Sequence, residues 1–202
     1  MAWSAAAVEF AASPNQVTPL LLGSNMPDAP LRRIDGRSIS LKQLVGGKPA
    51  ILVFYRGSWC PYCNLQLSGL RLIEKDVQAL GYQLIAITPD RPEEMRKTLD
   101  KHALTYTLAS DVDAAAMKAF GIAYHVDAEL TGMLAKGGID LDKSSGTTHH
   151  ALPVPSVFIV DADGVIQFEY VHPDYRVRAP GDVILAAAKA IAEQKHRLKP
   201  TK

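Results

Sequence analysis

Two cysteines three positions apart are the residues best suited to chemistry in this sequence. They lie in the run Trp59-Cys60-Pro61-Tyr62-Cys63, and the chain has only these two cysteines. Two cysteines are too few for a disulfide-stapled scaffold, whereas a C-x-x-C pair beside a strand–helix pattern indicates redox or metal chemistry. In both cases the thiolate is the reactive form.

The elements on either side of the pair predict where the thiols lie. The segment from Ala50 to Tyr55 is continuously apolar, which is typical of a central strand covered on both faces. After the cysteines, apolar residues recur at helical spacing, at Leu70, Ile73, Val77 and Leu80. This pattern predicts a helix from about Cys60 to Leu80. Cys60 is therefore expected at a helix N-terminus, where free backbone N–H groups favour a thiolate.

The spacing also predicts a role for each cysteine. Pro61 falls in the first helical turn, where its missing N–H costs nothing. Cys63 then lies on the same helix face as Cys60, so the two sulfurs can form a disulfide. We expect Cys60 to attack and Cys63 to resolve the product through this redox-active disulfide, without a cofactor. Arg56 has two interpretations, a surface ion pair or a cation that favours the thiolate.

The aromatic residues beside the cysteines also have two interpretations each. Trp59 can pack in the core or offer a flat docking surface to partner proteins. Tyr62, between the cysteines, can tune the redox poise or only cover the helix start.

A second candidate segment lies about ninety residues further along the chain. Pro153-Val154-Pro155-Ser156 leads directly into an apolar strand at 157–160. Pro155 is a candidate for a cis peptide bond, which would mark a tight turn. Such a turn would bring the Val154 backbone beside the sulfurs, where it could hydrogen-bond a substrate.

The remaining pattern predicts one α/β domain with a mixed central sheet flanked by helices. The expected strands are 31–34 and 37–41 around Asp35-Gly36, 82–88, 105–108, 157–160 and 165–171, and the expected helices are 40–44, 92–102, 113–120 and 182–198. Residues 124–152 are weakly patterned and are interpreted as an insertion before the Pro155 strand. Residues 1–28 are expected to form an N-terminal extension laid over the domain at 29–202.

Taken together, the motif after a buried strand and Val154-Pro155-Ser156 before a hairpin resemble the thioredoxin superfamily over about residues 29–195. Within it, the run from Val53 to Leu67 resembles the peroxiredoxin-like branch, the AhpC/TSA or redoxin group. This resemblance implies an antioxidant oxidoreductase in which Cys60 attacks the O–O bond of a hydroperoxide and Cys63 condenses with the resulting sulfenic acid. It also implies a thioredoxin-like or other thiol reductant and a role in cell redox homeostasis.

The chain departs from the usual peroxiredoxin pattern in two ways. Gly57 and Val53 occupy the positions where peroxiredoxins carry a Thr or Ser and a Pro. Residues 153–156 also lack the arginine that such proteins supply near this strand. Ser58 and Arg56 are the candidates to replace these groups.

Two alternatives to the peroxidase remain open. The first is thioredoxin-type exchange with protein disulfides. The second is a metal module in which Cys60 and Cys63 bind zinc or copper together with His149 or His150, with Met133 nearby in sequence. A polar and aromatic cluster follows the last strand and stays unassigned, as a binding rim or solvated loop: Tyr170, His172, Tyr175, Arg176 and Arg178.

Composition limits the partners. The 202 residues are 48% hydrophobic, and 22 Lys and Arg against 21 Asp and Glu give a net charge of +1. This balance offers no attraction for nucleic acid or an anionic membrane, and no apolar run reaches the roughly 18 residues of a membrane span. The alanine-rich N-terminus carries Glu9 and lacks a basic start, so it is a poor secretory signal. A cytoplasmic location is expected, or a periplasmic or exported one if a leader is missing. The sequence does not indicate the oligomeric state.

Overall fold

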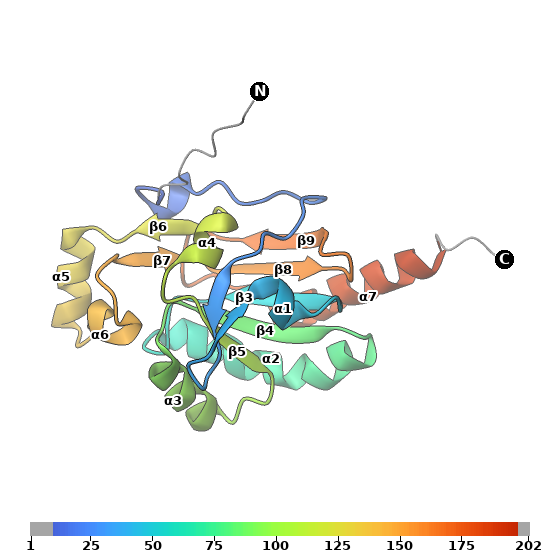
Figure 1. The fold of residues 1–202 in the computed structure, drawn as a ribbon, viewed down its shortest axis with the longest axis horizontal. Coiled ribbons are helices and arrows are strands. Elements are labelled where there is room, and N and C mark those ends of the chain that lie inside the picture. Colours follow the sequence, from blue (N-terminus) through green and yellow to red (C-terminus); the bar gives the residue numbers. More distant parts are fainter. Residues whose placement is uncertain (1–9, 198–202) are drawn as a thin grey trace.

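A seven-stranded mixed sheet forms the centre of the computed structural model, which describes residues 10–197 (Figure 1). The strand order is β2-β1-β5-β4-β3-β8-β9. The bounds are β1 (Pro30–Arg32), β2 (Ser38–Ser40), β3 (Ala50–Phe54), β4 (Gln83–Thr88), β5 (Thr107–Ser110), β8 (Ser156–Val160) and β9 (Ile166–Val171). β4 runs parallel to β3 and β5, and the other neighbours pair antiparallel. The predicted mixed sheet of a thioredoxin-like fold is confirmed.

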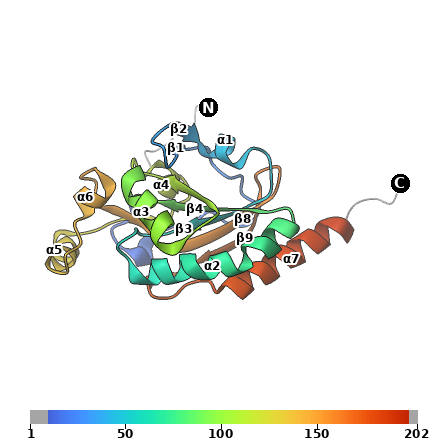
Figure 2. The same cartoon turned by 90° about the horizontal axis from the view of Figure 1, so that it is seen from below.

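Helices cover both faces of this sheet. They are α1 (Leu41–Val45), α2 (Pro61–Ala79), α3 (Pro92–His102), α4 (Ala115–Ala119) and α7 (Gly181–Arg197). Alternate residues of β3 enter two separate apolar clusters, Leu52 and Phe54 with residues of α1 and α4, and Ile51 and Val53 with residues of α2 and α7. Figure 2 shows α2 and α7 side by side along one face. A strand buried on both faces explains the continuous apolar run in the sequence.

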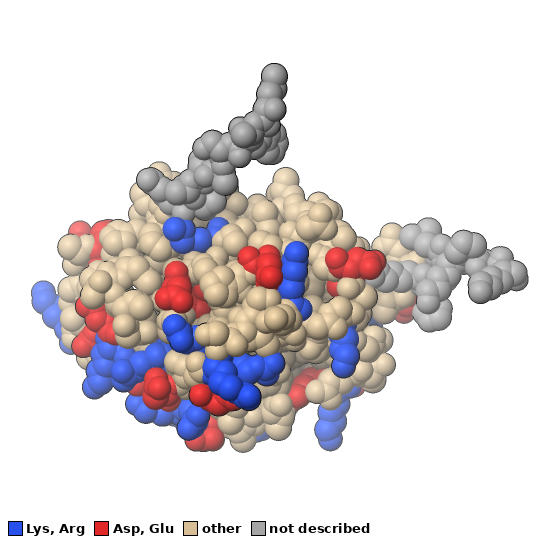
Figure 3. Space-filling model, viewed as in Figure 1, with Lys and Arg blue, Asp and Glu red and all other residues tan. Residues whose placement is uncertain are grey.

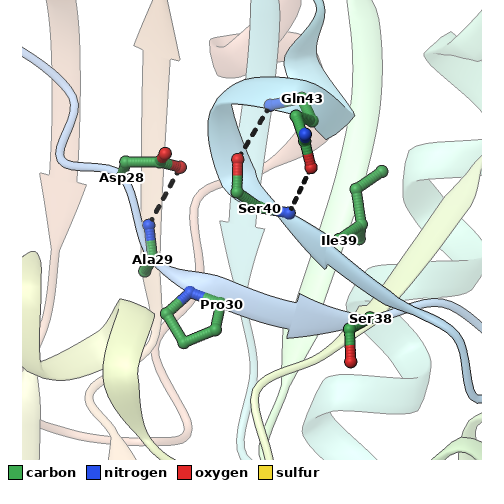
Figure 4. Close-up of a pocket in the computed structure, with 7 residues that line it drawn as sticks. All are labelled: Asp28, Ala29, Pro30, Ser38, Ile39, Ser40 and Gln43. Carbon is green, nitrogen blue, oxygen red and sulfur yellow. Dashed lines mark hydrogen bonds between the residues drawn. The ribbon is translucent and has the colours of Figure 1, made fainter.

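The first hairpin and the first helix of the domain form where local sequence signals predict them. β1 and β2 form the expected hairpin, and Ser40 caps α1 in a reciprocal capping box. Its Oγ accepts from the Gln43 backbone N–H (3.2 Å), and Gln43 Oε1 accepts from the Ser40 N–H (3.1 Å). Gly46 ends the helix in the left-handed conformation. The surface pocket in Figure 4 lies here, and its seven lining residues include none of the predicted site residues.

Residues 123–153 form a small unit of their own rather than an irregular insertion. It contains β6 (Ala123–His125), α5 (Ala128–Lys136), α6 (Leu141–Ser145) and β7 (Ala151–Pro153), with β6 and β7 paired antiparallel. Figures 1 and 2 show α5 and α6 beside the main body, away from the sheet. None of the residues of α5 is buried, which explains why the helix left little apolar periodicity. The buried core of the unit packs against Trp59, next to the cysteine motif.

The N-terminal segment from residue 10 lies along the domain, as expected for an arm. The Thr18 N–H donates to the Gly121 carbonyl (3.0 Å), and the Met26 N–H donates to the Gly164 carbonyl (2.7 Å). Residues 1–9 and 198–202, which include the expected end of the last helix, lie outside the described residues. The boundary at residue 28 stays a prediction.

Two surface properties bear on the choice of partner. In the part of the chain that the structure describes, no helix is both long and apolar enough to cross a bilayer. On the face shown in Figure 3, Lys and Arg side chains are interspersed with Asp and Glu. Such mixing agrees with the near-zero net charge and gives this face no single sign of charge.

Candidate active site

The cysteine pair lies where the sequence predicts, at the junction of β3 and α2. Cys60 is the N-cap residue of α2, and its Sγ accepts a hydrogen bond from the Cys63 backbone N–H (3.4 Å). Pro61 takes the first helical position, as expected. Both cysteines are free thiols, with Cys60 1% exposed and Cys63 fully buried. The helix start therefore supplies a donor to the Cys60 sulfur.

The loop that carries Cys60 is held by a buried carboxylate. Asp90, just after β4, accepts a hydrogen bond from the Ser58 backbone N–H (2.6 Å) and another from the Ser144 hydroxyl (2.5 Å) on α6. The Ser58 carbonyl also accepts from the Asn64 side chain on α2 (2.8 Å). The side chain of Ser58 hydrogen-bonds to Asp90 as well. The polar groups of Ser58 thus fix the loop through Asp90.

Arg178, from the loop before α7, contacts both sulfurs. Its Nη2 lies 3.1 Å from Cys63 Sγ and 3.7 Å from Cys60 Sγ. The guanidinium is oriented by Nε, which donates to the Tyr175 carbonyl (2.8 Å), and by Nη1, which donates to Gln66 Oε1 (3.3 Å). Sequence reasoning left Arg178 in an unassigned cluster. It lies 115 residues from Cys63, and no motif connects the two.

Arg56 is the second guanidinium at the site, and it is buried at 4% exposure. It follows β3 and lies between two aromatic rings, 5.0 Å from the ring centroid of Trp59 and 4.4 Å from that of Tyr175. The interpretation of Arg56 as an exposed ion-pair residue is therefore wrong. Trp59 is half-buried and packs between two apolar clusters, whereas Tyr62 is 40% exposed and meets Tyr175 edge to face.

The two thiols have opposite tendencies to ionise. The pKa of Cys60 is lowered to about 6, first by the hydrogen bond from the Cys63 thiol and then by the Cys63 N–H and the charges of Arg178 and Arg56. Burial raises the pKa of Cys63 well above its usual range. At neutral pH this asymmetry gives a thiolate at Cys60 and a thiol that can donate at Cys63.

The structure corrects the prediction for Pro155. The described residues contain no cis peptide bond, so Pro155 is trans. The Val154 N–H donates to the Ile122 carbonyl (2.9 Å), and the Val154 carbonyl accepts from the Ser156 hydroxyl (2.7 Å). The Val154 backbone is therefore fully engaged and does not offer a free edge to a substrate. Ile122, which takes the N–H, precedes the strand β6, and nothing in the sequence pattern indicated this pairing.

The ligands needed for the metal alternative do not come together. His149 Nε2 lies 2.9 Å from the Val112 carbonyl, and His150 Nε2 lies 2.6 Å from Asp142. Met133 is exposed on α5. Among residues 10–197, no group of three or more His, Cys, Asp and Glu side chains is arranged to hold a metal ion. Within this part of the chain, the cysteine pair is thus not joined by the further ligands that zinc requires.

A thioredoxin-like fold that carries two thiols at a helix N-terminus is typical of thiol-dependent oxidoreductases. A model of the AhpC/TSA family matches residues 22–169, which is most of the chain. The chain therefore belongs to the AhpC/TSA family.

Three relatives show the extent of this likeness. Peroxiredoxin Bcp of Escherichia coli (strain K12) is 29% identical over 169 residues, covering 84% of this chain and 96% of the relative. A putative peroxiredoxin of Mycobacterium tuberculosis is 30% identical over 168 residues, covering 83% and 93%. The crystal structure of reduced Prx3 in complex with H2O2 from Vibrio vulnificus superposes with a TM-score of 0.68 at 18% identity, covering 84% and 99%. The solved structure supports the fold, and the two sequence relatives agree with the family.

Proposed function

We propose that the protein is a thiol-dependent peroxidase that reduces hydroperoxides through Cys60, with Cys63 as the resolving cysteine. The observation that carries this proposal is the charge asymmetry of the pair: Arg178 contacts both sulfurs, yet only Cys60 has a lowered pKa. With a pKa of about 6, roughly nine-tenths of Cys60 is thiolate at pH 7. The peroxiredoxin relatives support the same activity.

The chemistry proceeds in three balanced steps. The Cys60 thiolate attacks one peroxide oxygen, so that an S–O bond forms, the O–O bond breaks, and the alkoxide or hydroxide leaves with a proton as alcohol or water. The Cys63 thiol then attacks the sulfenic sulfur of Cys60, forming the disulfide and releasing water. A dithiol reductant restores both thiols by exchange and is itself oxidised to a disulfide. Cys60 and Cys63 are the groups of this chain that change oxidation state in the cycle.

Geometry favours a small peroxide over a protein disulfide as the oxidant. Cys60 is 1% exposed and Arg178 Nη2 lies 3.7 Å from its sulfur, so a small oxidant requires less rearrangement of the reduced site than a protein disulfide does. The backbone edge at Val154, which would bind an extended peptide, is already hydrogen-bonded. We further propose that a thioredoxin-like protein of the cytoplasm is the reductant.

A paired assay tests this function. Hydrogen peroxide consumption with a thioredoxin reducing system and insulin disulfide reduction are measured for the wild type, Cys60→Ser and Cys63→Ser. Peroxide turnover is expected for the wild type alone, while Cys63→Ser still forms one sulfenic acid per chain, trapped by dimedone. Insulin reduction by the wild type without peroxide turnover would refute the proposal.

A further inference from the structure

Arg56 is a buried cation that forms no direct ion pair. Among the residues that the structure describes, no Asp or Glu oxygen lies within 4.0 Å of its guanidinium, and its Nε has no hydrogen-bond partner. The rings of Trp59 and Tyr175 attract the guanidinium, but a ring face carries no net charge. Because burying a cation without a counter-charge is costly, an anion is expected nearby.

Asp90 lines the same small cavity as Arg56. The cavity has a volume of about 10 Å³, and its wall also includes Trp59 and Ser144. Asp90 is 1% exposed, and with a pKa of about 6 roughly nine-tenths of it is carboxylate at pH 7. Two opposite charges therefore share one cavity without touching each other.

Arg56 is the cation that fits Asp90. The other titratable groups around Asp90 are Tyr55, Glu94, His149 and His150. Burial raises the pKa of Tyr55 and lowers that of His149, so both are neutral at pH 7. Glu94 is itself acidic and raises the pKa of Asp90. His150 already pairs at 2.6 Å with an aspartate of α6.

A single water molecule fits between the two charges. To hold a water, a cavity needs about 10–15 Å³ and two to four polar partners. The Nε of Arg56 is a free donor. The N–H and hydroxyl of Ser58 and the hydroxyl of Ser144 use three acceptor positions of Asp90, and a carboxylate has about four. A water can therefore accept from one group and donate to the other, which is nearly as favourable as a direct hydrogen bond.

We propose that one internal water bridges Arg56 Nε and the Asp90 carboxylate, and that this water-mediated ion pair fixes the loop that leads to Cys60. Asp90 already accepts from the Ser58 N–H at 2.6 Å, so the pair holds both neighbours of Gly57. The loop is closely packed here, because a Cβ on Gly57 would lie 2.9 Å from Asp90 Oδ1 and even closer to the indole nitrogen of Trp59. This inference goes beyond the proposed function, since neither charged group changes oxidation state in the cycle.

The ion pair is tested by an NMR titration of the Asp90 carboxyl in reduced protein that carries ¹³C-labelled aspartate. The signal of Asp90 is the one that Asp90→Asn lacks. Its midpoint is expected near pH 6 in the wild type and about one unit higher in Arg56→Met and Arg56→Gln, because loss of a neighbouring cation disfavours the carboxylate. Arg56→Lys keeps the charge, and Arg71→Met removes an exposed arginine of α2, so both are expected to stay near pH 6. An unmoved midpoint in the neutral variants would overturn the ion pair.

The water is tested by a crystal structure of the reduced wild type at pH 7.5, which needs no variant to fold. One water within hydrogen-bond distance of both Arg56 Nε and an Asp90 oxygen is expected. Direct contact between the two side chains, or no water that joins them, would overturn the bridge.

The hold on the loop is tested by hydrogen exchange of the Ser58 amide. Exchange is expected to be at least about tenfold faster in Arg56→Gln than in the wild type, as for loss of one hydrogen bond to a charged group. An equal rate in both proteins would show that the pair does not fix the loop. Trapping of the Cys60 sulfenic acid by dimedone in the same wild-type protein tests the peroxidase cycle separately, so failure of one leaves the other standing.

Discussion

Replacement of Arg178 by Met tests how the site activates its thiolate. The substitution removes the guanidinium that lies 3.7 Å from Cys60 Sγ and 3.1 Å from Cys63 Sγ, and leaves a side chain of similar length. A neighbouring opposite charge lowers the pKa of an acid by about one to three units. Because Arg178 is partly exposed, solvent screens its charge, and we expect an increase of about one unit in the Cys60 pKa, from about 6 toward 7.

The expected change in reactivity reverses with pH. A one-unit higher pKa lowers the thiolate fraction about tenfold at pH 5, but makes each thiolate about threefold more nucleophilic. Alkylation of Cys60 is therefore expected to be about threefold slower than in the wild type at pH 5 and about threefold faster at pH 9. Loss of thiolate stabilisation is therefore expected to make the pH–rate profiles of the wild type and Arg178→Met cross.

The assay is alkylation of the reduced protein by iodoacetamide, with the modified cysteine assigned by mass spectrometry. The control is Arg71→Met, which removes an exposed arginine of α2, the helix that begins after Cys60. It is expected to follow the wild-type profile. A profile for Arg178→Met with its midpoint still near pH 6 would refute the reasoning, since Arg178 would then not stabilise the thiolate. A uniform loss of rate at every pH would show damage to the fold instead.

Three further predictions concern other parts of the structure. Cys63→Ala is expected to raise the Cys60 pKa above about 6, because the hydrogen bond from the Cys63 thiol is the largest cause of its lowering; titration of thiolate absorbance at 240 nm checks this. Burial raises the pKa of Asp90 to about 6, above the roughly 3.9 of an unfolded chain, so this group contributes stability below pH 4 that is lost as pH rises through 6. Asp90→Asn is expected to remove about 3 kcal/mol from the pH dependence of the free energy of unfolding, measured with urea. The same change of unfolding free energy with pH in both proteins would contradict this expectation. Gly121→Ala forces a methyl group onto a backbone carbonyl of the N-terminal arm, whereas Gly81→Ala meets open space at a similar positive φ, so thermal unfolding is expected to show Gly121→Ala as the less stable by about 2 kcal/mol.

The parts of the fold that sequence predicts well are those fixed by local patterns. The buried run ending at Phe54 became β3, and the helix expected at 92–102 has those bounds. Ser40 and Gly46 cap α1 through interactions within a few residues. The unit at 123–153 was not resolved into elements, because α5 packs too lightly to leave a periodic apolar face. The helix begins at a local signal instead, since the Asp127 side chain accepts from the Leu130 N–H (2.7 Å) as an N-cap.

The residues of the candidate site also divide into those that local sequence predicts and those that distant contacts place. Cys60 and Cys63 are visible in sequence because the chemistry of each depends on the other and on the helix that starts between them. Arg178 is not visible, because its contact with the sulfurs depends on where the loop before α7 crosses the start of α2. The cis bond predicted at Pro155 is wrong, and the free Val154 edge expected beside it is lost because the Val154 N–H donates to Ile122, whose position the local sequence does not indicate.

The departures of this chain from the usual peroxiredoxin pattern have a common physical meaning. Gly57 brings no hydroxyl to the thiolate, and the loop residue Ser58 directs its hydrogen bonds to Asp90. The negative charge on Cys60 is therefore stabilised first by the Cys63 thiol and N–H and then by the two guanidinium groups. One short loop controls both, since Tyr175 lies on Arg56 at 4.4 Å and its carbonyl accepts from Arg178 at 2.8 Å. The reactivity of the thiolate is thus tied to the conformation of the loop before α7.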